Sequence, residues 1–389
     1  MTSRTRWAIF LISTPLVVLI AVGGLLGATR TATTQASFPQ LRVFEEVVSL
    51  VFAAYVEEVD VDKVMDGAMR GLADSLDPPS AYLSPREVEA IDAKAALPPG
   101  RTGLTVTRQF WTRVIGVRDG SPAARAGLRT GDFIRMIDDK ATRDLSAIAA
   151  TNLLAGAPGS KVKLLVVRNN PGDPHEVTLT REALPTDLVS SKKLAGGEPY
   201  VRVQSFGAGA AAALRKQIDS LGAAAARGVI VDIRGVADGE VDEGIAAARH
   251  FIKSGAVATL AGRNETDKTV TSAGSGDGAL AMPVVLLVSN GTANGAEVFA
   301  GALAGAKRAT LVGEPTAGLA ARQRLVRLPE GHGLWMTYAR YLQADGKPLH
   351  GQGLRPEILV EPTFVPFGEP APAGDPGLDK AVERLKNGL

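Results

Sequence analysis

Cysteine is absent from this 389-residue chain, and histidine and aromatic residues are scarce. The absence of cysteine excludes disulfides, thiolate zinc sites, iron–sulfur clusters and cysteine nucleophiles. The four histidines, His175, His250, His332 and His350, are scattered singly, without the paired spacing of a zinc-binding helix. We therefore expect neither a metal site nor a cofactor.

The chain also lacks an excess of charge of either sign, because 43 Lys and Arg residues stand against 41 Asp and Glu residues. No basic block stands out, so nucleic acid is not an expected partner. Hydrophobic residues make up 45% of the chain and glycine is abundant, which is typical of an α/β protein with packed cores. The length is sufficient for about two or three domains.

One long apolar run occurs, from Trp7 to Gly27, and Arg4 and Arg6 precede it. Its 21 uncharged residues are enough to cross a bilayer as a helix. We therefore predict that residues 1–30 form an uncleaved membrane anchor in a bacterial cell membrane, with the bulk of the chain on the periplasmic or extracytoplasmic side. A cleaved secretory signal is the alternative, although the exit from the run matches an Ala-x-Ala-like site poorly.

The rest of the chain changes character three times, which predicts an α/β multidomain protein. Residues 38–96 carry an amphipathic helical pattern, and residues 98–182 alternate short β-type runs with turns. Residues 183–363 alternate strands and helices, which indicates an α/β core with buried parallel strands. Residues 364–389 are predicted to be a Pro/Gly-rich linker followed by a short terminal helix.

A run in the second segment, from Gly120 to Ile134, reads GSPAARAGLRTGDFI. Ser121 is suited to cap a short helix and Gly127 to end it. This run closely resembles the central signature of bacterial PDZ domains, which bind a peptide as an extra strand. The resemblance implies a loop that offers backbone N–H groups to a peptide carboxylate: Gly103, Leu104, Thr105 and Val106. A spacer domain with a filled groove is the alternative.

From about Phe38 to Leu389 the chain is similar to the carboxy-terminal processing peptidases, also called tail-specific proteases. The motifs that carry this resemblance are Gly71–Leu83, Tyr200–Phe206, Gly228–Arg234 and Gly351–Glu357. The resemblance implies an α/β core, an inserted PDZ domain that docks substrate C-termini, and a Ser–Lys dyad with a backbone oxyanion hole.

The positions that carry the family's chemistry are substituted. In the family the nucleophile lies in a run like Gly-Thr-Ala-Ser-Ala-Ser-Glu, and here the serine position holds Asn294. The position of the lysine base holds Leu319, at the 25-residue separation that the family pattern requires. A glycine position of the oxyanion turn holds Asp238, whereas Glu297 and Gln323 keep their places.

These substitutions remove the expected chemistry, since Asn294 supplies no useful nucleophile and Leu319 has no lone pair to accept a proton. We therefore predict an inactive, membrane-anchored homologue that binds protein C-terminal tails through its PDZ domain as a scaffold or adaptor. A homo-oligomer or an active homologue is a further expected partner. One alternative is an active serine-type endopeptidase with a relocated nucleophile, Ser289 or Thr292; another is a small-molecule site near Asn294 and Gln323.

Overall fold

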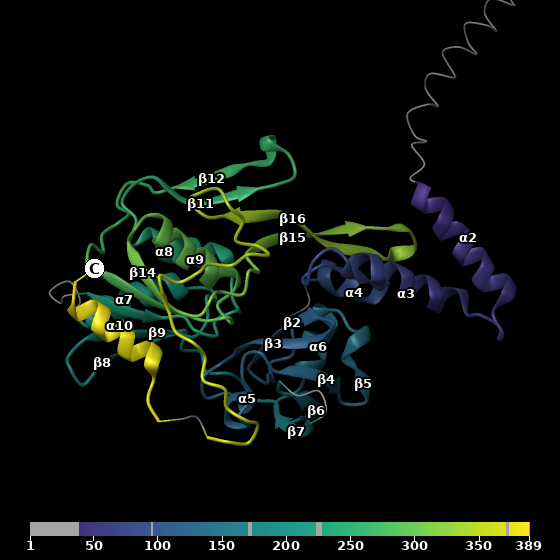
Figure 1. Ribbon diagram of the computed structural model, residues 1–389, viewed down its shortest axis with the longest axis horizontal. Helices are drawn as coiled ribbons and strands as arrows, with labels where there is room; N and C mark the ends of the chain where they lie inside the picture. Colours follow the sequence, from purple (N-terminus) through teal and green to yellow (C-terminus); the bar gives the residue numbers. More distant parts are fainter. Residues whose placement is uncertain (1–38, 95, 170–172, 223–227, 371–372, 389) are drawn as a thin grey trace, which may run out of the picture. The chain divides into compact units, whose positions relative to one another are not determined.

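The structure is a computed structural model, and it describes residues 39–94, 96–169, 173–222, 228–370 and 373–388 (Figure 1). The chain divides into two units, residues 1–69 and residues 70–389. The first unit contains α2 (Pro39–Ala54) and most of α3 (Val61–Asp74). The amphipathic pattern predicted a helix here, and none of the α2 side chains is buried within the part that the structure describes.

The predicted membrane location is corrected by the helices of the structure. Crossing a bilayer takes about 20 apolar residues in a helix, and α2, an apolar one, has 16. Across the described ranges, no helix is both long and apolar enough to span a membrane. This finding contradicts the prediction of a single-pass membrane protein. The predicted anchor at residues 1–30 lies outside the described residues.

The core of the second unit is a six-stranded sheet in the order β17-β14-β13-β10-β9-β8. Its strands are β8 (Val189–Lys193), β9 (Pro199–Val203), β10 (Val229–Asp232), β13 (Val284–Val288), β14 (Ala309–Gly313) and β17 (Ile358–Leu359). All neighbours are parallel except β8, which is antiparallel to β9. Every residue of β10, β13 and β14 is buried, as expected for strands covered on both faces.

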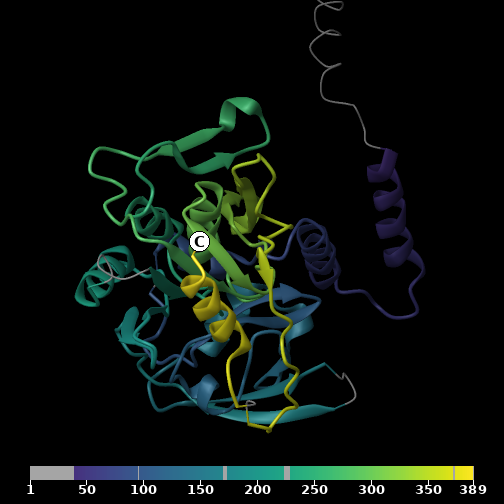
Figure 2. The same cartoon turned by 60° about the vertical axis from the view of Figure 1, so that its left-hand side comes forward.

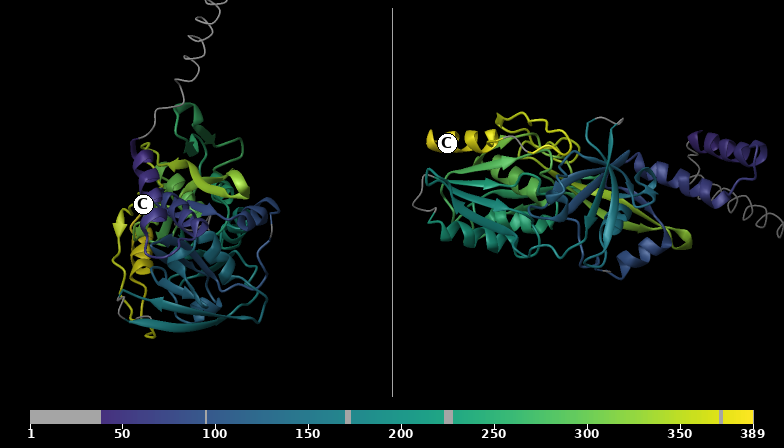
Figure 3. Two further views of the ribbon diagram at one scale, coloured as in Figure 1. Left: turned by 90° about the vertical axis from the view of Figure 1, so that its right-hand side faces the viewer. Right: turned by 90° about the horizontal axis from the view of Figure 1, so that it is seen from below.

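Helices cover the two faces of this sheet (Figure 3). One face carries α7 (Ala210–Ser220), α8 (Val241–Arg249) and α9 (Asn294–Gly305), and the other carries α10 (Pro376–Lys386). Successive strand residues point to opposite faces of the sheet and so belong to different hydrophobic clusters. Leu286 belongs to the cluster that includes α9, whereas Leu287 packs with Leu385 of α10. The two clusters follow from the period of two in a strand.

A second, antiparallel sheet lies beside the core in the order β1-β16-β11-β12, with β15 paired to β16. These strands are β1 (Ala81–Leu83), β11 (Ala256–Ala261), β12 (Thr269–Ser272), β15 (Ala321–Arg327) and β16 (Gly333–Leu342). Helix α4 (Pro85–Asp92) follows β1, and its first turn is held by a capping box between Ser84 and Glu87. Short 3-10 turns lie at Thr142–Asp144, Glu265–Asp267 and Pro329–Gly331.

A separate antiparallel sheet, β2-β3-β4-β6-β7, forms with α5 and α6 the unit that we call the β2–β7 module. Its elements are β2 (Leu104–Gln109), β3 (Trp111–Val117), α5 (Pro122–Arg125), β4 (Phe133–Ile137), β5 (Lys140–Ala141), α6 (Ala147–Leu154), β6 (Lys161–Val167) and β7 (Pro174–Thr180). The short β-type runs predicted for this segment, and the short helix predicted between Ser121 and Gly127, are present. The coarse prediction of a mixed α/β fold with several sheets is therefore confirmed.

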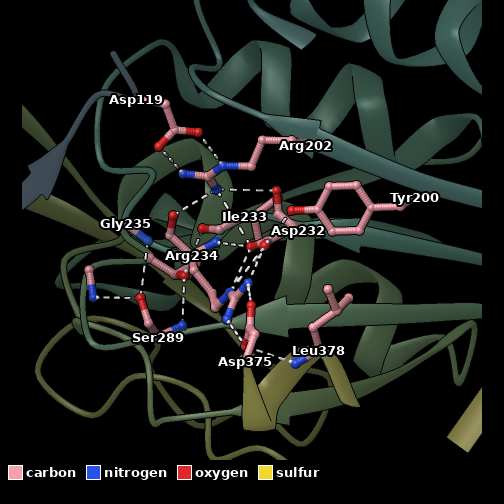
Figure 4. Close-up of polar contacts among 12 residues, drawn as sticks. Asp119, Tyr200, Arg202, Asp232, Ile233, Arg234, Gly235, Ser289, Asp375 and Leu378 are labelled. Carbon is pink, nitrogen blue, oxygen red and sulfur yellow. Dashed lines mark hydrogen bonds and ion pairs between the residues drawn. The ribbon is translucent and has the colours of Figure 1, made fainter. Parts of the chain in front are cut away.

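The module packs directly on the core through β3. A Cβ atom on Gly116 would lie 2.7 Å from the Gly235 carbonyl oxygen, and one on Gly291 would lie 2.4 Å from the Ile115 oxygen. Only glycine permits backbones to approach so closely. On the same side, Arg202 of β9 donates to both carboxylate oxygens of Asp119, at 2.8 and 3.1 Å (Figure 4).

A second connection comes from residues 361–370, which we call the C-terminal strap. The strap passes along β6 and β7 before the chain enters α10 (Figures 1 and 2). Arg168 of the module donates to the carbonyls of Val365 and Pro366, and Phe367 stacks on His175 at 4.4 Å between ring centres. The strap therefore ties the module to the helix that covers the core sheet.

Candidate functional site

The first candidate position, Asn294, begins α9 directly after the turn that follows β13. Its backbone is left-handed, with φ of 49°, a conformation that asparagine adopts more readily than most residues. The Asn294 Nδ2 donates to the Ala237 carbonyl at 2.8 Å, and the Ala293 N–H donates to the Val236 carbonyl at 3.0 Å. These bonds fasten the start of α9 to the turn after β10.

Glu297, one turn into α9, holds the second candidate position in place. Its fully buried carboxylate accepts hydrogen bonds from the backbone N–H groups of Gly318 and Leu319, both at 2.8 Å, and from the Thr316 hydroxyl. Burial raises the pKa of Glu297 to about 7, although these hydrogen bonds act in the opposite direction. The loop from Thr316 to Leu319 is therefore anchored to α9.

Leu319 fills an apolar position at this anchor. Its side chain is 8% exposed and packs in a cluster with Ile115, Ala237 and Ala293. A lysine in this position would have to place its amine among the same apolar neighbours, and burial of an unpaired ammonium is costly. Leucine satisfies the packing without that cost.

Asn294 and Leu319 line one cavity of about 420 Å³, which we call the groove cavity. Gln323 lines it as well, and its Nε2 donates to the Thr337 hydroxyl at 3.3 Å. Its other lining comes from β2, β3 and α6 of the β2–β7 module and from residues between Pro79 and Leu97, which include α4. Residues 25 positions apart in the sequence thus meet in a hollow shared with another domain.

Asp238 lies elsewhere, beside a smaller hollow of about 80 Å³ that we call the loop cavity. The Asp238 carboxyl is 3.9 Å from Arg118, and burial raises its pKa. Gly239 follows with a φ of 104°, and a Cβ atom there would lie 2.2 Å from the Phe206 carbonyl carbon. Gly239 is thus required by the packing of the turn.

The predicted peptide-binding loop borders both cavities. Gly103 turns with a φ of 84°, and a Cβ atom there would lie 2.1 Å from the Ser121 Cβ. Gly103 and Leu104 line the loop cavity, Val106 lines the groove cavity, and Thr105 lines both. The two hollows therefore follow one another along β2.

The edge of β2 is open to a further strand. Of the described strands, β2 pairs with β3 alone, so its second edge carries no strand partner. Helix α6 faces β2, and its Ala147, Ile148 and Thr151 line the groove cavity. A strand edge without a strand partner, beside a groove, is the arrangement that binds extended peptides by strand addition.

Arg118 is a site residue that the sequence analysis missed. Its Nη2 donates to the carbonyls of Pro185 and Asp187, at 2.7 and 3.3 Å, but its buried Nε has no partner within the described structure. Arg118 lines the loop cavity next to Gly103. Arg118 lies two residues before the GSPAARAGL run, and this position in the sequence could have identified it as a site residue.

The hydroxyls proposed for a relocated nucleophile are engaged by the backbone. The Ser289 Oγ accepts from the N–H groups of Gly235 and Gly291, at 3.0 and 3.3 Å (Figure 4). Thr292 is fully buried, and its Oγ1 donates to the Ile233 carbonyl at 3.0 Å. Neither residue lines the groove cavity.

The histidines lie apart from these hollows. His350 pairs with Asp77 at 2.9 Å, and His332 stacks on Tyr82 at 5.2 Å between ring centres. No group of three or more histidine and acidic side chains suited to a metal occurs in the part of the chain that the structure describes. Lys94, an exposed residue, also lines the groove cavity, and the sequence analysis did not single it out.

Comparisons with known proteins identify both parts of this arrangement. The model of peptidase family S41 matches residues 199–360, and a PDZ domain model matches residues 113–168. The carboxy-terminal processing protease CtpA of Bacillus subtilis is 29% identical over 340 residues, which cover 87% of this chain and 72% of that protein. The chloroplastic C-terminal processing peptidase of Tetradesmus obliquus is 30% identical, over 77% of this chain and 68% of its own length.

A solved structure shows the same arrangement. The photosystem II D1 C-terminal processing protease superposes with a TM-score of 0.68 at 26% identity, over 85% of this chain and 95% of that structure. The fold and sequence together define an S41-type peptidase core with an inserted PDZ domain. The chain belongs to the family of carboxy-terminal processing peptidases, and the predicted resemblance is confirmed.

The predicted site residues are distributed over two neighbouring cavities. The groove cavity brings together Asn294, Leu319, Gln323, Thr105 and Val106, and the loop cavity brings together Asp238, Gly103, Leu104 and Thr105. Glu297 is buried behind Leu319. Their roles as altered catalytic positions and as a peptide-binding loop stay predictions, as do the domain boundaries.

Proposed function

We propose that this protein captures the free C-termini of other proteins between β2 and α6, and that it does not hydrolyse peptide bonds. The observation that carries the proposal is the groove cavity, which joins an open PDZ strand edge to the substituted positions Asn294 and Leu319. A homologue of this kind acts as a scaffold or adaptor for tails of its partners, including an active homologue or a second copy of itself.

Capture of a carboxylate is supported by the loop cavity. A peptide carboxylate placed at Gly103 meets backbone N–H groups and the unpartnered Nε of Arg118. Hydrogen bonds to charged groups contribute about 1.5–3 kcal/mol, so loss of the peptide's charge weakens binding roughly tenfold or more. The Asp238 carboxyl lies 3.9 Å from the Arg118 guanidinium, and burial raises its pKa.

Absence of hydrolysis is supported by the chemistry of the groove cavity. An amide at Asn294 and an alkyl chain at Leu319 leave no nucleophile and base pair at the positions where the family carries them. Ser289 and Thr292 are held by backbone hydrogen bonds outside this cavity, which argues against relocation of the nucleophile to either.

Binding is tested with the full chain and a short fluorescent peptide that ends in Leu-Val with a free carboxylate. We expect micromolar binding, with the C-terminal amide of the same peptide weaker by roughly tenfold. Arg118→Gln should remove this preference, whereas Arg125→Gln, an exposed arginine paired with Glu182, should keep it. Equal binding of acid and amide by the wild-type chain would overturn carboxylate capture.

Hydrolysis is tested separately by incubation of the wild-type chain with casein and by labelling with a serine-directed fluorophosphonate. We expect intact casein by mass spectrometry and no labelled adduct. Casein cleavage that is abolished by Ser289→Ala or Thr292→Val would show that the protein is an active peptidase with a relocated nucleophile.

A further inference from the structure

The two faces of the PDZ sheet contact different parts of the protein. Val114 of β3 is fully buried in the module's own core, together with α6 residues such as Ala150. Its neighbour Ile115 points to the opposite face and packs with Leu319 and Ala293 of the peptidase core. One face of this sheet is therefore covered by α6 and the other by the substituted catalytic region.

The groove cavity reaches both faces around the open edge of β2. Its walls include Ala147 and Thr151 of α6, and Ile115 and Leu319, which pack together where the module meets the core, with Trp335 of β16 beside them. Side chains of a strand point alternately to the two faces of a sheet. A peptide that adds to β2 therefore directs every second side chain toward the face on which Leu319 lies.

The order of the cavities gives the register. The loop cavity, where the carboxylate binds under the proposed function, is lined by Thr151 and Leu154 of α6 and shares Thr105 and Thr151 with the groove cavity. With the terminal side chain of the tail placed against Thr151 and Leu154, the penultimate side chain lies on the other face of the added strand, toward the core.

We propose that Leu319, with Ile115 and Trp335, selects tails that carry an apolar residue at the penultimate position. The inference rests on the proposed function and adds a specificity to it. Burial of a charged side chain against these apolar walls is costly without a partner, whereas an aliphatic side chain gains by leaving water. The substitution at Leu319 thus supplies a binding surface at the place where the family carries its base.

The test compares two peptides that share a free C-terminal valine and differ only in penultimate leucine or lysine. With the full wild-type chain we expect the leucine peptide to bind at least roughly tenfold more tightly. Leu319→Glu should reverse this order. Leu319→Ala, which introduces no buried charge, should reduce the preference several-fold. A pair of peptides that differ at the third residue from the end is the control, because that side chain faces α6 and should respond to Thr151→Ala instead.

The outcomes separate this inference from the proposed function. Discrimination between acid and amide, combined with equal affinity for penultimate leucine and lysine, would overturn the inference and leave tail capture intact. A penultimate preference that persists unchanged in folded Leu319→Ala and Leu319→Glu proteins would also overturn it. Absence of binding by every free-carboxylate peptide would instead overturn the proposed function itself.

Discussion

At the residue scale, Glu297 links the two substituted positions. Its carboxylate lies in the first turn of the helix that Asn294 begins and accepts the backbone N–H of Leu319. A fully buried carboxyl with no cation among its hydrogen-bond partners is expensive to ionise. Retention of Glu297 is explained by the loop that it anchors, which is a structural task independent of hydrolysis.

The raised pKa of Glu297 predicts how stability depends on pH. The folded pKa of about 7 lies above the ordinary value of 4.5, so the folded state binds a proton more tightly than the unfolded state does. The stabilisation is complete below about pH 4.5 and is lost as the pH rises through about 7. We expect the free energy of unfolding, measured with urea, to fall by about 2–3 kcal/mol from this group between pH 5 and pH 8.

Two variants isolate this contribution. Glu297→Gln should flatten the decline, while lowering stability overall because its amide nitrogen cannot accept from the Leu319 N–H. Glu243→Gln is the matched control, since Glu243 also accepts two backbone N–H groups, those of Gly209 and Ala211, nearer the surface. A pH dependence that is the same in Glu297→Gln as in the wild type would assign the slope to other groups.

At the element scale, the strands that were predicted are those with a simple apolar pattern. Short strands were predicted for residues 98–182 and buried parallel strands for residues 183–363, and both kinds are observed, β13 among the latter. The β15–β16 hairpin was missed because most of its residues are half-exposed, so its sequence has no clean alternation. Helix α7 ends at Ser220, and Gly222 follows with a left-handed φ of 64°.

At the site, too, some residues could be identified from sequence motifs, whereas others are brought in only by the tertiary structure. Asn294 and Leu319 were singled out through the family resemblance, and parallel pairing of β13 with β14 explains why the loops after these strands emerge at one edge. Trp335 and Ile115 were not predicted as their neighbours, since no local pattern reports a contact between residues so far apart in the chain.

The start of α9 and the loop that carries Leu319 hold the two substituted positions. Restoring the family's serine and lysine at these positions is therefore a direct test. Loss of a nucleophile or base typically lowers turnover about 10⁶-fold, and the two losses are not additive. We therefore expect Asn294→Ser alone and Leu319→Lys alone to leave casein intact. The double change should give measurable cleavage, located by mass spectrometry, and Asp238→Gly added to it should increase the rate.

The same changes have a structural cost that serves as a check. Asn294→Ser removes the hydrogen bond to the Ala237 carbonyl and places serine at a left-handed φ, so we expect about 1 kcal/mol of destabilisation. Leu319→Lys alone should destabilise more, because it buries an unpaired amine. Cleavage by either single variant would show that a catalytic partner exists outside these two positions.

At the scale of the whole second unit, the C-terminal strap decides how the PDZ sheet is presented to the core. Arg168 is the centre of the attachment, because it pairs with Asp132 at 2.6 Å and also donates to two strap carbonyls. Phe367 of the strap packs between the Arg168 guanidinium, at 5.0 Å, and the His175 ring. The strap, the Arg202–Asp119 pair and the close approach of Gly116 to Gly235 together keep β2 facing Leu319.

This arrangement predicts that Phe367→Ala loosens the module without unfolding it. Loss of the stacked ring should cost about 1–2 kcal/mol locally, with faster hydrogen exchange in β6 and β7 and in the strap. Phe364→Ala is the matched control, since Phe364 is 58% exposed in the same strap. Because a loosened module no longer holds the tail against Leu319, Phe367→Ala should weaken the preference for penultimate leucine. Equal effects of the two substitutions would mean that the strap does not orient the module, and that the contacts of β3 with the core are sufficient to do so.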